Sequence, residues 1–153
     1  EAATGALLCH GGRLFVAAAN VDQLLALDAC DGRPLWAVPR SGRIRHLLGV
    51  AQGRLIAAGD QLWGFDMETG TAWRCGYDDP EGFGYGAGAV HDDRVYWSTR
   101  ENLFVVDAAT GALLESIGLA GQDGLSGGNL VIDGNRLLIA SKSQLTLLGP
   151  ATK

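Results

Sequence analysis

The sequence has few basic residues and no long apolar run. Its 153 residues include two lysines, Lys142 and Lys153, and the formal net charge is −5. A mildly acidic chain without a basic cluster argues against a nucleic acid or an anionic membrane surface as a partner. No apolar run approaches the roughly 18 residues of a membrane-spanning helix. The sequence therefore predicts no membrane span.

Cysteine is scarce, and several motifs of metal, nucleotide and haem sites are absent. Cys9, Cys30 and Cys75 are widely separated and include no C-x-x-C pair, whereas a structural zinc site needs closer pairs. We expect buried or inert thiols, with a Cys30–Cys75 disulfide as an open alternative. The sequence also lacks H-E-x-x-H, a P-loop and the haem motif C-x-x-C-H.

Glycine is abundant. The chain holds 23 glycines and 4 prolines, and 47% of its residues are hydrophobic. This balance favours a globular domain of short strands joined by tight turns. Helices are a poor alternative, because glycines interrupt the sequence repeatedly, 23 in 153 residues, and no apolar stripe of period 3.6 survives.

One stretch, residues 26–36, recurs along the chain. An apolar run ends in an aspartate, a turn with glycine follows, and a tryptophan comes shortly after. The copies contain Asp28, Gly32 and Trp36, then Asp66, Gly70 and Trp73, then Asp107 and Gly111. The aspartates are 38 and then 41 residues apart, and a period near 40 is typical of a repeat architecture.

Each repeat contains short apolar runs separated by turn residues, which is the pattern of β-hairpins. The second and third runs of a repeat are apolar on both faces, which is typical of a sheet covered on both sides. Antiparallel sheets covered by their neighbours are the blades of a propeller. We therefore predict an all-β fold, a β-propeller of four-stranded antiparallel blades, with about four blades in one domain, 1–153. The expected blades are residues 6–40, 44–76, 85–119 and 126–149, the last without its fourth strand.

The pattern Ala26-x-Asp28-x-x-x-Gly32-x-x-x-Trp36 resembles the tryptophan-docking motif of the PQQ-like (quinoprotein-like) β-propeller family. The resemblance implies that the aspartate and glycine shape a turn and that the tryptophan packs between neighbouring blades. Trp73 arrives one residue early, and Glu115 stands where the third tryptophan would be. The implied docking residues are Asp28, Gly32, Trp36, Asp66, Gly70, Trp73, Asp107 and Gly111. The resemblance also favours a periplasmic or other extracytoplasmic location.

The docking motif is a packing device, so it indicates a fold more strongly than an activity. Dehydrogenases of this family use PQQ and Ca²⁺ and have adjacent cysteines, which this chain lacks. We expect a non-catalytic scaffold or protein-interaction module without a cofactor, rather than an enzyme. Two alternatives stay open: a fragment of a quinone- and calcium-dependent dehydrogenase, and an envelope assembly factor resembling the outer-membrane β-barrel assembly lipoprotein.

Residues 77–88 form the most unusual predicted loop, which is acidic, aromatic and rich in glycine. Paired acids with aromatic rings can bind a cation or a sugar, although the pattern is not that of an EF-hand. A plain connection between blades is the alternative. The candidate partner-binding residues are Tyr77, Asp78, Asp79, Glu81 and Tyr85.

Three histidines, His10, His46 and His91, lie on or beside the first run of a repeat. Matching positions in different blades are separated by the rotation of the ring, so these side chains need not meet. We expect them to cap turns or to be partly exposed, and we predict no metal site.

The number of predicted blades determines whether this chain can close a ring by itself. The resemblance implies closure with about eight blades, and this chain holds about four. Residues 1–8 closely copy residues 107–114, so residues 6–10 are either a fourth strand for the last blade or the first strand of the first. Unfinished edges and apolar faces drive association. We expect a part of a larger ring, completed by further blades, a second copy as a homodimer, or another protein; a closed four-bladed ring is the alternative.

Overall fold

The computed structural model describes residues 5–18, 21–39, 44–75, 84–121 and 124–149. These residues form four antiparallel sheets, and within each sheet the strands pair in the order in which they follow one another in the sequence. The first sheet comprises β1 (Ala6–His10), β2 (Arg13–Ala17), β3 (Gln23–Asp28) and β4 (Pro34–Pro39). The second comprises β5 (Ile44–Ala51), β6 (Arg54–Gly59), β7 (Leu62–Asp66) and β8 (Ala72–Cys75).

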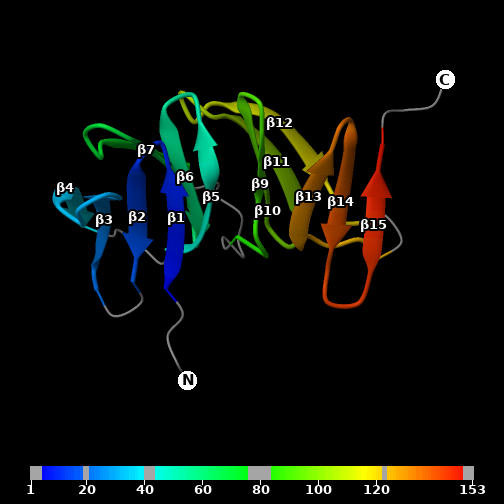
Figure 1. Cartoon of the computed structure of the whole chain (residues 1–153). Helices are drawn as coiled ribbons and strands as arrows, with labels where there is room; N and C mark the ends of the chain where they lie inside the picture. The colour runs from blue at the N-terminus through cyan, green and yellow to red at the C-terminus, as the bar shows by residue number, and fades with distance from the viewer. Residues whose placement is uncertain (1–4, 19–20, 40–43, 76–83, 122–123, 150–153) are drawn as a thin grey trace.

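The third sheet comprises β9 (Ala89–His91), β10 (Arg94–Ser98), β11 (Asn102–Asp107) and β12 (Leu113–Gly118). The fourth comprises β13 (Asn129–Asp133), β14 (Arg136–Ala140) and β15 (Leu145–Leu148). Figure 1 shows the sheets side by side, with the first and the fourth at opposite ends of the array. The all-β class and the antiparallel four-stranded sheets are as predicted.

Tight turns join the strands because the sequence supplies residues that tolerate positive φ. Gly11 and Gly12 connect β1 to β2 with φ of 57° and 73°, the type of two-residue turn whose twist matches that of the flanking strands. In the third sheet the equivalent turn contains Asp92 at φ 54°. These turns set the register that places each aspartate of the repeat at the end of a strand.

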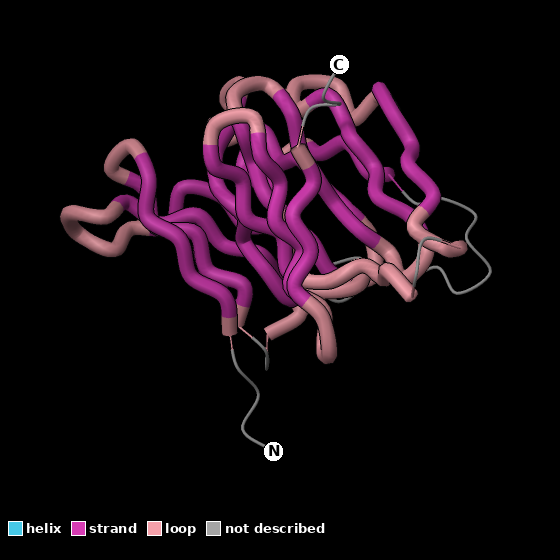
Figure 2. The backbone as a smooth tube through the Cα atoms, turned by 90° about the vertical axis from the view of Figure 1, so that its right-hand side faces the viewer, coloured by secondary structure: helices cyan, strands magenta, loops and turns pink. Residues whose placement is uncertain are grey.

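The apolar core lies between successive sheets, in three clusters. The first joins the first two sheets through side chains such as Phe15, Leu24 and Trp63. The second joins the second and third sheets, with Trp97 fully buried in it, and the third joins the third and fourth sheets. The two inner sheets therefore have an apolar cluster on both faces, and each end sheet on one. Figure 2 shows the strands of the array from its right-hand side.

The first strands of the sheets lie along a common edge. β1 contacts β5, β5 contacts β9, and β9 contacts β13. β1 also pairs with β2 throughout, from Ala6 opposite Ala17 to His10 opposite Arg13. Residues 6–10 are thus the first strand of the first sheet, and within the described residues the fourth sheet has three strands.

Candidate functional site

Three turns of the same construction follow β3, β7 and β11. In each, the aspartate carbonyl accepts a 2.8 Å hydrogen bond from the amide of the glycine four residues later. The glycines lie in the left-handed region, at φ of 74°, 75° and 76°, where a side chain would be strained. The residues are Asp28 and Gly32, Asp66 and Gly70, and Asp107 and Gly111.

The aspartate carboxylates stabilise these turns by accepting further hydrogen bonds. Asp66 Oδ1 accepts from the amides of Thr69 at 3.0 Å and Glu68 at 2.9 Å, and from the Thr69 hydroxyl at 3.2 Å. These bonds, led by that from the Thr69 amide, lower the pKa of Asp66. The pKa of Asp107 is lowered chiefly by the hydroxyl and then by the amide of Thr110, each 2.8 Å from Oδ1.

Trp36 of β4 spans the boundary between the first and second sheets. Its indole Nε1 donates to the carbonyl of Met67 at 2.8 Å. A Cβ placed on Gly70 would lie 2.9 Å from the indole, so only glycine leaves room for the ring at this point. The turn after β7 in the second sheet therefore binds the tryptophan of the first sheet.

Trp73 of β8 repeats this arrangement on the third sheet. Its Nε1 donates to the carbonyl of Ala108 at 3.1 Å, and a Cβ on Gly111 would lie 2.7 Å from the ring. Trp73 comes one residue earlier in its repeat than Trp36, yet both reach the same register, because a bulge in the β3–β4 pairing accommodates the additional residue. Both indoles are half-buried.

The third sheet has no tryptophan at this place. Glu115 pairs with Val105 across a second bulge, and it occupies the position that corresponds to Trp36 and Trp73. Glu115 is exposed. The boundary between the third and fourth sheets therefore depends on the apolar cluster that includes Leu103, Leu119, Leu130 and Ile139.

A second link between sheets was not identified from the sequence. Arg13 Nη2 lies 2.6 Å from Oε1 and 2.7 Å from Oε2 of Glu68, so β2 is tied to the turn after β7. The sequence signal for this link was an arginine that begins the second strand of every sheet, namely Arg13, Arg54, Arg94 and Arg136. The corresponding contact of Arg54 is with the Thr71 carbonyl in its own sheet, at 3.4 Å.

Most of the predicted partner-binding loop, Tyr77, Asp78, Asp79 and Glu81, lies outside the described residues. Tyr85 is described, and its backbone is structural: its amide donates to the Ser98 carbonyl at 2.8 Å, and the Ser98 hydroxyl donates to its carbonyl at 3.0 Å. Its side chain is 41% exposed and lines a hollow of about 250 Å³ that Lys142 also lines. Partner binding by these five residues stays a prediction.

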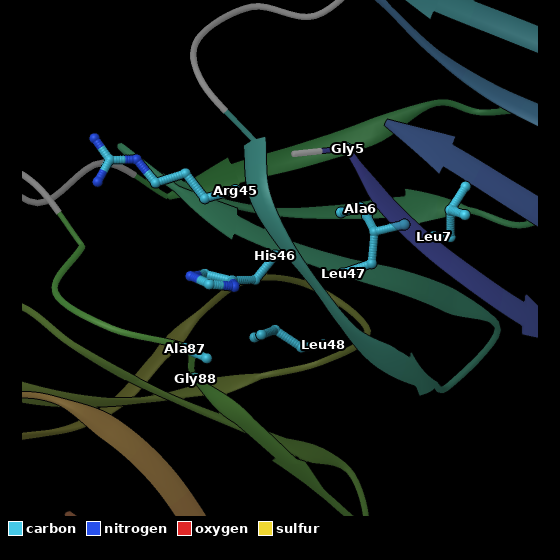
Figure 3. A pocket seen from close by; sticks show the side chains of 9 residues that line it. All are labelled: Gly5, Ala6, Leu7, Arg45, His46, Leu47, Leu48, Ala87 and Gly88. Carbon is cyan, nitrogen blue, oxygen red and sulfur yellow. The ribbon is translucent and has the colours of Figure 1, made fainter. Parts of the chain in front are cut away.

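A larger open hollow, of about 560 Å³, lies beside the first strands of the first two sheets. Figure 3 shows its lining residues, Gly5, Ala6, Leu7, Arg45, His46, Leu47, Leu48, Ala87 and Gly88. Burial, and secondly the charge of Arg45, lower the pKa of His46. Arg45 Nη2 lies 3.4 Å from Asp60 Oδ1. None of the nine lining residues is a carboxylate, so the lining provides no side-chain ligand that a hard cation such as Ca²⁺ prefers.

The other candidate residues do not converge. His10 and His91 are exposed, and none of the three cysteines forms a disulfide; Cys75 Sγ donates to the Gly111 carbonyl at 2.7 Å. Within the described part of the chain, no group of three His, Cys, Asp or Glu side chains could hold a metal ion. The same part contains no helix long and apolar enough to cross a membrane.

The outward faces of the two end sheets are apolar. Leu7, Val16, Leu25 and Ala37 form one row across the first sheet, and they alternate with residues buried against the second sheet. We call this row, with Leu14 and Leu27, the first outer face. Val131, Leu138 and Leu147 form a row across the fourth sheet, which we call, with Leu145, the last outer face.

Comparison of equivalent positions shows what these faces correspond to. Leu145 is 68% exposed, whereas its counterparts in the other sheets are 0%, 0% and 1% exposed. These counterparts are Leu24, Leu62 and Leu103. On the first outer face, Leu25 corresponds to Trp63, which is 2% exposed. Each outer face thus presents apolar residues at positions whose equivalents in the other sheets are buried between sheets.

Comparisons with known proteins agree with this architecture. A family model described as outer membrane protein assembly factor BamB matches residues 2–151, and a search of the curated proteins finds no match. Among solved structures, the computationally designed Ika4 protein has a TM-score of 0.76 and 14% identity, covering 97% of this chain and 92% of that chain. BamB from Moraxella catarrhalis has a TM-score of 0.73 and 19% identity, covering 95% and 45%. A europium-containing methanol dehydrogenase has a TM-score of 0.64 and 19% identity, covering 84% and 26%.

The sheets and their docking turns define a β-propeller segment built from PQQ-like repeats. The chain belongs to the PQQ-repeat propeller family whose model is described as outer membrane protein assembly factor BamB. The predicted family and fold are confirmed. This chain spans less than half of the BamB structure, at 45% of its length, and at these identities the solved structures show the fold alone.

Proposed function

We propose that this chain is a non-catalytic propeller segment whose two end blades bind further blades, so that it works as a scaffold and protein-interaction module. The observation that supports this most is the apolar character of both outer faces at positions that are buried between the inner blades. Leu7 at 67% and Leu145 at 68% exposed lie on opposite ends of the array. Exposed apolar patches of this kind mark interaction sites.

The two faces are complementary in type. The first outer face corresponds to the side that an inner blade turns toward its predecessor, and the last outer face to the side turned toward its successor. A head-to-tail contact between them closes a ring when the rotation permits it. Further blades of a longer polypeptide, or a second copy in a homodimer, satisfy this requirement equally.

A matched pair of variants tests the proposal. Leu145→Ser removes an apolar side chain from the last outer face, whereas Leu113→Ser changes a leucine of comparable exposure, 47%, on the third blade. We expect the unaltered chain to associate with increasing concentration in sedimentation velocity, and Leu145→Ser to weaken that association about tenfold or more. Equal behaviour of the two variants would argue that the outer faces bind nothing.

The absence of an enzymatic role is part of the proposal and has its own test. We expect no heat of binding in a calorimetric titration with pyrroloquinoline quinone and Ca²⁺, because the described residues bring no carboxylate cluster to the 560 Å³ hollow that Arg45 and His46 line. Saturable binding of both would favour the alternative, a fragment of a quinone- and calcium-dependent dehydrogenase.

A second candidate function is that of an envelope assembly factor. The family match over residues 2–151 favours it. In an outer-membrane protein assembly assay, we expect the unaltered chain to raise the yield of assembled protein and Leu145→Ser to raise it less. No effect of either would remove this candidate and leave the scaffold proposal in place.

A further inference from the structure

A small open hollow of about 250 Å³ lies where the segment before the third sheet meets the fourth sheet, beside the turn that joins β14 to β15 (Figure 1). Tyr85 and Gly86 line one side of it, and Gly128, Asn129 and Lys142 line the other. Pockets that hold a drug-sized ligand or cofactor have volumes of roughly 300–1,000 Å³. This hollow is smaller, so it suits a single functional group.

The backbone around the hollow is held by one buried side chain. The hydroxyl of Ser98, which is 1% exposed, donates to the Tyr85 carbonyl at 3.0 Å and shares this bond with the Gly128 carbonyl at 3.1 Å. The Gly128 amide donates back to the hydroxyl at 3.2 Å. A Cβ on Gly86 would collide with the Gly128 carbonyl, so only glycine lets the two segments approach this closely. The walls are therefore fixed before a ligand binds, which lowers the cost of binding.

The Asn129 side chain is oriented by the same framework. Its Oδ1 accepts the Ala87 amide at 2.8 Å. Because a backbone N–H is a donor, the atom that faces it is the carboxamide oxygen, and this fixes the position of Nδ2. The Asn129 Nδ2, the Tyr85 hydroxyl and the Lys142 ammonium donate to no acceptor among the described residues. Three side-chain donors thus line one hollow with their hydrogen bonds unused.

The charge at this hollow is opposite in sign to that of the whole chain. The formal net charge is −5, but none of the lining residues is acidic and Lys142 is a cation. A carboxylate carries one negative charge, which the ammonium balances, and its two oxygens accept several hydrogen bonds. A dianionic phosphate would leave one negative charge uncompensated in an acidic protein. The donors therefore favour a carboxylate.

We propose that Lys142, Asn129 and Tyr85 form a carboxylate-binding site, in which the ammonium, the Nδ2 amide and the phenol hydroxyl donate to the carboxylate oxygens. The carboxylate belongs to an acidic side chain of a bound peptide or to a free small molecule. The Tyr85 ring, which is 41% exposed, provides apolar surface for the rest of the ligand. This inference is independent of the proposed function, because the site uses neither outer face.

The first test is a titration of the full chain with sodium acetate, followed by two-dimensional amide NMR. We expect saturable shifts of the Gly86, Asn129 and Lys142 amides at millimolar concentration, and added salt should weaken the binding. The Gly32 and Gly70 amides, in the turns after β3 and β7, are internal controls and should not move. Acetamide has the shape of acetate without its charge and should bind about fivefold more weakly or less. Equal binding of acetamide, or shifts of the same size at the control glycines, would overturn the proposal.

Variants separate the site from the general effect of charge. Lys142→Ala should weaken acetate binding about fivefold or more. Arg33→Ala removes an equal charge from an exposed position between β3 and β4 and should leave it unchanged. Asn129→Asp keeps the oxygen that accepts the Ala87 amide but replaces the donor with a negative oxygen, so binding should be lost while the Tm is kept. Tyr85→Phe, which retains the ring, should weaken binding about twofold or more. Equal losses in Lys142→Ala and Arg33→Ala, or full binding by the Asn129 and Tyr85 variants, would refute the site.

A peptide probe identifies the source of the carboxylate. The tripeptide acetyl-Gly-Glu-Gly-amide is compared with acetate and with its glutamine version, which should not bind. Affinity for the glutamate peptide about threefold or more above that for acetate supports the site with a peptide as its ligand, and equal affinity supports it with a small carboxylate. No saturable shift with either carboxylate, or tighter binding of inorganic phosphate than of both, would overturn the assignment.

Discussion

Gly64 of β7 supports the most direct test of how the blades are joined. A Cβ at this position would lie 2.2 to 2.4 Å from three atoms of the Trp73 indole, far closer than ordinary van der Waals contact. In Gly64→Ala the ring must therefore move by about 1 Å or more. That movement weakens the 3.1 Å hydrogen bond from Trp73 Nε1 to the Ala108 carbonyl and shifts the ring on Gly111.

The expected loss can be estimated from these contacts. Overpacking costs about 1–3 kcal/mol, and weakening one hydrogen bond costs about 1 kcal/mol. Replacing glycine by alanine at an unstrained position stabilises the protein by about 0.5–1 kcal/mol, because alanine reduces the conformational entropy of the unfolded chain. The net loss in the free energy of unfolding is about 2 kcal/mol, which lowers the Tm by roughly 4–8 °C for a domain of this size.

Differential scanning calorimetry measures this effect, with Gly118→Ala as the matched control. Gly118 is the last residue of β12, and a Cβ there meets nothing within 4 Å among the described residues. We expect the Tm of Gly118→Ala to be unchanged or slightly higher. Refutation would come from a Gly64→Ala variant that is as stable as the unaltered protein, since Trp73 would then not be held as the structure shows.

Three further predictions follow from individual contacts. Trp36→Ala should reduce the free energy of unfolding by about 3 kcal/mol in urea titrations, the low end for this substitution because the indole is half-buried; no measurable change would contradict the docking of Trp36. The folded-state pKa of His46 is below its ordinary value of 6.5, so the unfolded chain binds more protons below that pH and stability should fall as the pH drops through 6.5. His46→Gln should flatten this part of the pH profile, and an unchanged profile in that variant would contradict the assignment to His46. Thr110→Val should raise the pKa of Asp107 toward 3.8 in an NMR titration while leaving Asp66 unchanged; equal titration in both proteins would mean that the hydroxyl contributes nothing.

Much of the fold could be predicted because it depends on local patterns. The glycine turns and the apolar runs indicated the hairpins, and the aspartate–glycine–tryptophan repeat indicated how the sheets follow one another. In the sequence, the early position of Trp73 makes its repeat a weaker match to the docking motif. Its origin is a bulge beside Leu27 in the first sheet, and spacing along a sequence does not reveal which strand pair has the additional residue.

Contacts between distant segments were not predictable in the same way. The Arg13–Glu68 ion pair joins residues of two different sheets, and only the packing of the sheets brings them together. The role of residues 6–10 was also ambiguous, since their sequence copies a fourth strand while β1 pairs as a first strand. Pairing with β2 through a two-glycine turn decides this, because the local hairpin closes a shorter loop than a distant contact.

The molar mass of the unaltered protein tests the central claim, that both end blades bind further blades. Light scattering should be measured at several protein concentrations and combined with a thermal melt. Our account predicts a species heavier than the 16.0 kDa chain, with a mass that rises with concentration, or a poorly cooperative melt when the outer faces stay uncovered. A monomer of 16.0 kDa at every concentration, with one sharp cooperative transition, would contradict it.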